Sequence, residues 1–121
     1  MIKLLPTALL SAVLALAQNA SMDSANADMK AGKYAEAMKT LEAELKAKPK
    51  DPAIMKALAD ASFAQGTRLM NDEKLPPGRK YPASLRAFRQ AAALDPSNRK
   101  AAENVKMIEG IYKSMGRPIP E

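Results

Sequence analysis

The chain has 121 residues, enough for one domain, and it contains neither cysteine nor histidine. Thiol nucleophiles, disulfides and zinc sites are therefore excluded, and so is histidine as a general base near neutral pH. The formal net charge of +6 favours acidic partners or anionic surfaces only weakly, because an excess of lysine also suits an ordinary soluble surface.

The first 17 residues have the three-part layout of a secretory signal peptide. Lys3 gives a positive start, an apolar run covers residues 4–17, and an A-x-A cleavage motif occupies residues 15–17. This run is too short to span a bilayer, for which roughly 20 residues are needed. We expect residues 1–17 to be removed, so that a small bacterial protein without a membrane span is exported to the periplasm or secreted. The alternative is an uncleaved anchor or a buried first helix.

Two helices are predicted at the start of the mature chain. Ser21 caps the first, which runs to about residue 31 with little apolar content, and Gly32 supplies its stop. The second covers about residues 34–48, where apolar side chains such as Leu41 recur at helical spacing. Pro49 then ends it.

A third helix is predicted to start at Asp51 and Pro52, as cap and first-turn residue, and to continue past Gly66 to about Met70. After it, residues 71–80 interrupt the pattern. The sequence Leu-Pro-Pro-Gly at residues 75–78 is expected to be an extended loop, since it contains two prolines and a glycine.

The last two predicted helices follow this break. The fourth opens at residues 81–82 and closes at residues 95–96, with Phe88 facing inward. The fifth starts after residues 97–98, one of which caps it, and ends at Gly116. The five residues beyond form a non-helical tail that contains two prolines.

One pattern of small, aromatic and proline residues occurs twice along this helical region. Its members are Ala25, Gly32, Tyr34, Ala37, Leu41 and Pro49, and then Leu58, Ala59, Gly66, Tyr81, Ser84, Phe88, Ala91 and Pro96. The pattern resembles that of the tetratricopeptide-repeat family, in which one repeat takes 34 residues. The two closing prolines are 47 residues apart. The second unit therefore carries an insertion, which we place in the turn between its helices, at about residues 67–80.

The resemblance implies an all-α fold over residues 18–121. We expect an α-solenoid of antiparallel helix–turn–helix repeats, with about two tetratricopeptide units and a C-terminal capping helix. Such an array is short, since stable arrays usually need about three repeats. Either the added length near Leu69 and Leu75 enlarges the core, or a second chain supplies packing surface and the protein is a homo-oligomer.

In this family the first helix of each repeat lines a concave groove that holds a protein or peptide segment. The resemblance therefore implies a protein-binding adaptor or scaffold, and the alternative is a self-associating structural subunit of an envelope assembly. The groove residues implied by position are Met22, Asn26, Met29, Lys56, Asp60, Phe63, Lys100, Asn104 and Met107. We expect Lys56 and Lys100 to favour acidic sequences. The alternative for Phe63 is that it only fills space between helices.

Cationic residues in or beside the insertion form a candidate basic patch. Its members are Arg68, Lys74, Arg79, Lys80, Arg86 and Arg89. An acidic protein segment, a polyanion or an anionic membrane surface could dock there, because long loops on rigid scaffolds often carry recognition. The alternative is a solvated face whose charges pair with Asp72 and Glu73. Nucleic acid is not an expected partner, since exposed aromatic residues for stacking are scarce.

No combination of residues in the chain indicates catalysis. The 13 carboxylates are scattered, and the five glycines do not form a glycine-rich phosphate-binding loop. We therefore expect neither an enzyme nor a protein with a cofactor or a metal.

Overall fold

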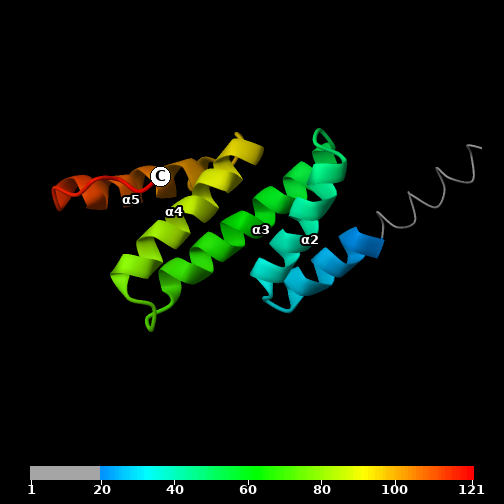
Figure 1. Ribbon diagram of the computed structural model, residues 1–121, viewed down its shortest axis with the longest axis horizontal. Coiled ribbons are helices and arrows are strands. Elements are labelled where there is room, and N and C mark those ends of the chain that lie inside the picture. Colours follow the sequence, from blue (N-terminus) through cyan, green and yellow to red (C-terminus); the bar gives the residue numbers. More distant parts are fainter. Residues whose placement is uncertain (1–19) are drawn as a thin grey trace, which may run out of the picture.

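The computed structural model describes residues 20–121, and over that range it consists of helices and their connections. A helical segment at residues 20–30 is followed by α2 (Tyr34–Ala47), α3 (Pro52–Asn71), α4 (Pro77–Leu94) and α5 (Arg99–Ser114). Each of α2 to α5 packs mainly against its neighbours in sequence, as Figure 1 shows. The predicted all-α class and helical-repeat architecture are confirmed. The predicted signal peptide lies outside the described residues.

Several local signals for helix starts and stops act as the sequence predicts, but Ser21 is not a cap, because it already lies within the helical segment at residues 20–30. The Asp51 carboxylate accepts hydrogen bonds from the backbone N–H groups of Ala53 and Ile54, at 2.9 and 3.3 Å. Asn98 is the cap of α5, since its side-chain oxygen accepts a hydrogen bond from the N–H of Ala101 at 3.0 Å. Gly32 and Gly116 have φ angles of +75° and +65°, a region that favours glycine.

The connection between α3 and α4 differs from the prediction. Only residues 72–76 are non-helical, because α3 continues to Asn71 and α4 already begins at Pro77. The predicted start of the fourth helix at residues 81–82, and the extended loop that included Gly78, were therefore wrong. Pro77 occupies the first helical position, where a missing N–H costs nothing and the fixed φ suits the helix. The added residues thus mainly lengthen two helices, and Pro82 lies inside α4.

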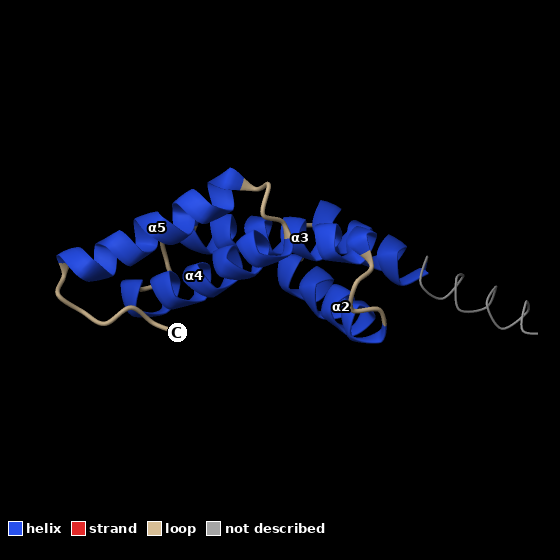
Figure 2. Cartoon of the chain, turned by 90° about the horizontal axis from the view of Figure 1, so that it is seen from above, coloured by secondary structure: helices blue, strands red, loops and turns tan. Residues whose placement is uncertain are grey.

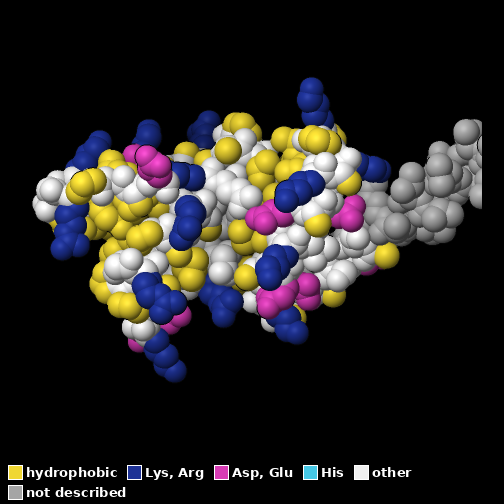
Figure 3. Space-filling view, viewed as in Figure 1, with side chains coloured by type: hydrophobic (Ala, Val, Ile, Leu, Met, Phe, Trp, Pro, Cys, Tyr) yellow, Lys and Arg dark blue, Asp and Glu magenta, His cyan; other side chains and the backbone are white. Residues whose placement is uncertain are grey.

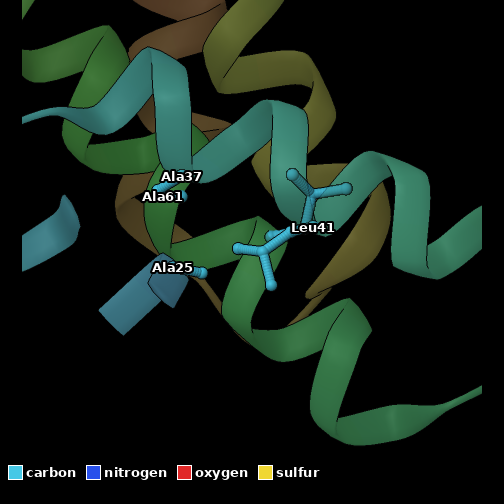
Figure 4. Packing of buried hydrophobic residues seen from close by; sticks show 5 residues of the cluster. Ala25, Ala37, Leu41 and Ala61 are labelled. Carbon is cyan, nitrogen blue, oxygen red and sulfur yellow. The ribbon is translucent and has the colours of Figure 1, made fainter. Parts of the chain in front are cut away.

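Small side chains bring the first three helices together. Ala25, Ala37, Leu41 and Ala61 are buried at their junction, as Figure 4 shows, and Leu58 belongs to the same cluster. Alanine at these contacts allows close approach of the helix backbones. The core of the first repeat is therefore built from alanine, leucine and methionine side chains, without an aromatic ring.

A second cluster joins α3, α4 and α5. Phe88 is fully buried with Leu85 and Ile108, and the Phe63 ring packs on the Phe88 ring with centroids 5.7 Å apart. The non-helical tail turns back toward α4, as Figure 2 shows. The Arg89 guanidinium donates a hydrogen bond of 2.7 Å to the carbonyl of Pro120, which holds this tail against the second cluster.

Candidate protein-binding grooves

One side of α3 lines three hollows in succession along the length of the helix. The α3 residues in these hollows recur mainly at three- and four-residue spacing, which places them on one stripe. They are Ala53, Lys56, Ala57, Asp60, Phe63, Ala64, Thr67, Arg68, Met70 and Asn71. We call this stripe with its three hollows the A-face groove.

The first hollow lies between residues 20–30 and the first half of α3, with a volume of ≈ 390 Å³. Asn26, Met29 and Lys56 are among its lining residues. The Lys56 Nζ lies 2.6 Å from the Asp60 Oδ1 and 3.6 Å from the Asp95 Oδ2. The hydrogen bond and the charge of Asp60 raise the pKa of Lys56. Two carboxylates thus surround one ammonium group, which opposes the expectation that Lys56 attracts acidic sequences.

The second and third hollows lie beside the C-terminal half of α3. The second, of ≈ 550 Å³, is lined by Tyr34, Phe63 and Arg68 among others. The third, of ≈ 230 Å³, lies between α3 and α5, where Met107 is 48% exposed. Thr67 lines both hollows, as Asn71 does. A ligand that extends from one hollow to the other would therefore pass over Thr67.

Most of the predicted groove residues lie in these hollows, namely Asn26, Met29, Lys56, Asp60, Phe63, Asn104 and Met107. Met22 instead packs against the first core cluster, and Lys100 is exposed near the start of α5. Phe63 takes both predicted roles, because it packs on Phe88 and also lines the second hollow. The role of the predicted groove residues in binding stays a prediction.

Two differences from the predicted groove follow from helix positions. Lys56 is the fifth residue of α3, whereas Lys100 is only the second residue of α5. The two other predicted groove residues of α5 are also three positions earlier than their counterparts in α3. The prediction also missed Thr67 and Asn71. Continuing the helical period beyond Phe63 would have found them, since α3 runs on through residue 71.

The six residues of the candidate basic patch do not gather at one place. Arg68 lines the second hollow of the A-face groove, whereas Arg86 lines a separate hollow between α2 and α4. Arg89 is bound to the carbonyl of Pro120, and Lys74 lies in the α3–α4 connection. Lys and Arg side chains are spread over the whole face that Figure 3 shows. The cations near the insertion therefore belong to different surfaces.

A second groove runs along the opposite side of α3, between α2 and α4. It consists of two hollows of ≈ 340 and ≈ 440 Å³, both of which Glu42 and Gln90 line. The Gln90 Nε2 donates a hydrogen bond of 3.4 Å to the Glu42 Oε1, which links α4 to α2. From α3 come Leu58, Gln65 and Leu69. We call these two hollows the B-face groove, which is not among the sites predicted from the sequence.

Asp95 provides a titration test of the first hollow. The Ser97 side chain donates a hydrogen bond to Asp95 and is the largest cause that lowers the pKa of this carboxyl, while the Lys56 ammonium adds a smaller effect. We expect Ser97→Ala to raise the pKa of Asp95 more than Lys56→Ala does, as measured by NMR titration. The reverse order would contradict this assignment. Because the pKa is lower in the folded state, this stabilisation is complete above the unfolded pKa of about 4 and is lost as pH falls through the folded value.

Residues 18–61 match the family model for the tetratricopeptide repeat. This stretch of the chain is a tetratricopeptide repeat. The match covers residues 20–30, α2 and the first half of α3, and it ends before the prolonged part of α3. Comparisons with curated proteins and with solved structures gave no match.

Tetratricopeptide repeats generally mediate protein–protein interaction, and the family typically binds rather than catalyses. The repeat at residues 18–61 therefore suggests a protein partner. Among its described residues, no helix has the length and apolar character needed to cross a membrane.

Proposed function

We propose that this protein is an adaptor that binds an extended segment of another protein along the A-face groove. The observation that carries the proposal is the single stripe of α3, which lines all three hollows from Ala53 to Asn71. Such a stripe on a packed helix is a rigid surface formed before binding, which reduces the entropy lost on association.

The chemistry of the groove changes along its length. At the first hollow, Asp60 and Lys56 are lining residues and Asp95 lies beside Lys56, so two carboxylates face one ammonium. In the second, Arg68 forms no ion pair within residues 20–121. Met107 in the third offers a flexible apolar surface that adapts to varied side chains. We expect a segment with apolar anchors, a basic residue near the first hollow and an acidic residue near the second.

The proposal can be tested by blocking the groove at Thr67, which is exposed and lines two hollows. The tagged chain, its Thr67→Arg variant and an Ala102→Arg control would each be used to capture proteins from a cross-linked extract of the source cell. Ala102 is exposed on α5. We expect one dominant foreign protein with the wild type and with the control, and about a tenfold or greater loss with Thr67→Arg. Equal capture by all three chains would contradict the proposal.

A second candidate is a self-associating structural subunit. The observation in its favour is the pair of exposed methionines on and just after α5, Met107 and Met115, which are 48% and 49% exposed. Exposed large apolar side chains at the end of a repeat array can pack against another chain. A molar mass that rises with protein concentration, together with capture of this chain alone, would favour the subunit over the adaptor.

We also propose that the protein works outside the cytoplasm, in the periplasm or after secretion. This part rests on the charged start, apolar run and A-x-A motif of residues 1–17. The captured chain is expected to begin at Gln18 when its N-terminus is read by mass spectrometry, and a chain that retains residues 1–17 would contradict cleavage.

A further inference from the structure

We infer that the B-face groove is a second docking site, which takes a short apolar segment flanked by acidic residues from a protein partner. It lies on the side of α3 opposite the A-face groove. Leu69, for example, is two residues from Thr67 and Asn71, and a step of two residues turns a helix by about 200°. A segment bound here would not compete with one bound in the A-face groove.

The shape of the groove suits an apolar segment. Met38 on α2, Leu69 on α3 and Ala87 on α4 contribute apolar surface to one hollow, and Leu45 contributes to the adjoining one. Because Ala87 has a short side chain, it leaves room between α2 and α4. Both hollows are lined by Glu42 and Gln90, so a single segment can extend through both.

The charges around the groove select an acidic segment. Lys39 and Lys46 stand on the α2 wall and Arg86 stands on the α4 wall, whereas Glu42 is the one carboxylate that lines either hollow. Within residues 20–121 none of these three cations forms an ion pair. Cations on both walls of an apolar groove complement a segment that carries Asp or Glu on either side of its apolar anchor.

Gln65 provides a further polar contact inside this groove. It lines the hollow with Leu69, and its buried Oε1 accepts no hydrogen bond from the described part of the chain. Buried side-chain oxygens usually have a donor. Once the Gln65 amide rotates toward the hollow, a backbone N–H of the docked segment would supply one, which favours a peptide over a wholly apolar ligand.

The inference can be tested with a library of random dodecapeptides displayed on phage and selected on the intact chain. We expect enrichment of peptides in which Leu, Met or Phe is flanked by Asp or Glu. A selected peptide, synthesised with a fluorescent label, should bind the Lys39→Glu/Arg86→Glu variant at least about fivefold more weakly at low salt, because each reversal replaces an attraction by a repulsion. Its affinity for the wild type should also fall as salt is added.

The Thr67→Arg variant is the matched control, since it changes the A-face groove alone. It should bind the selected peptide as the wild type does. Lys39 and Arg86 are both exposed, so their reversal is expected to leave the thermal unfolding curve unchanged. The inference is overturned if no such peptide class is enriched, if binding is independent of salt, or if Thr67→Arg abolishes binding and the double reversal does not. Failure of this site alone would leave the A-face proposal standing.

Discussion

Replacing Phe88 by alanine is expected to lower the free energy of unfolding by about 3–5 kcal/mol. Phe88 is the largest fully buried side chain among the described residues, and its cluster joins α4 to α5 and, through Phe63, to α3. Truncation removes apolar contacts and leaves a cavity that rigid helices can fill only in part. Urea unfolding followed by circular dichroism would measure the change.

Phe63→Ala is the matched comparison for this prediction. Phe63 belongs to the same aromatic pair, but it is only partly buried and lines a hollow. Its truncation should therefore reduce stability by clearly less than that of Phe88. A loss as large as for Phe88→Ala would show that Phe63 is mainly a core residue, and it would weaken the case that Phe63 contacts a partner.

Replacing Gly66 by alanine is expected to lower the free energy of unfolding by about 1–3 kcal/mol. This direction is opposite to the usual one, since alanine within a helix is favoured over glycine by about 1 kcal/mol. A Cβ at Gly66 would lie 2.7 Å from the Cε1 of Phe88. The Phe88 ring is buried and cannot move aside without disturbing the second core cluster.

Gly110→Ala is the control for this substitution. Gly110 is also within a helix, α5, but a Cβ there would meet nothing within 4 Å. We expect this variant to be more stable than the wild type by about 0.5–1 kcal/mol, through helix propensity alone. If both alanine variants were stabilised, the close approach of α3 to Phe88 would be wrong. Changing Phe88 to Leu in the Gly66→Ala background should relieve part of the steric strain.

Much of the fold follows from local signals in the sequence. The caps at Asp51 and Asn98 and the stop at Gly32 depend on a few neighbouring residues, so they could be predicted without any tertiary information. The α3–α4 connection could not, because Pro77 followed by Gly78 is compatible with both a loop and a helix start. Here the helix forms, and what the sequence indicated as a loop insertion becomes mainly added helix length.

The candidate site was predictable to the extent that it follows one helical stripe. The α3 members Lys56, Asp60 and Phe63 lie in the hollows because their spacing alone puts them on one side. Contacts between distant residues were not predictable. Lys56 is paired with Asp95, the residue just after α4, because the C-terminal end of α4 lies beside the start of α3. No local sequence pattern predicts that contact.

The B-face groove illustrates the same limit. Predicting this groove requires knowing which side of α3 faces the space between α2 and α4. The helical period places Gln65 and Leu69 on one stripe, but it does not tell which helices flank that stripe. The sequence also could not show that the predicted basic patch is divided. Arg68 lines the A-face groove, whereas Arg86 lines the B-face groove. Two grooves on one helix would allow the protein to hold two segments at once.

The most direct test of the adaptor proposal is photo-cross-linking from position 67 in the living source cell. A photoreactive phenylalanine analogue would replace Thr67 in the intact chain, and a second chain would carry it at the exposed control position Ala102. The proposal predicts that irradiation yields a major adduct with one foreign protein from position 67 and not from position 102. No adduct at position 67, or an adduct only with a second copy of this chain, would contradict it.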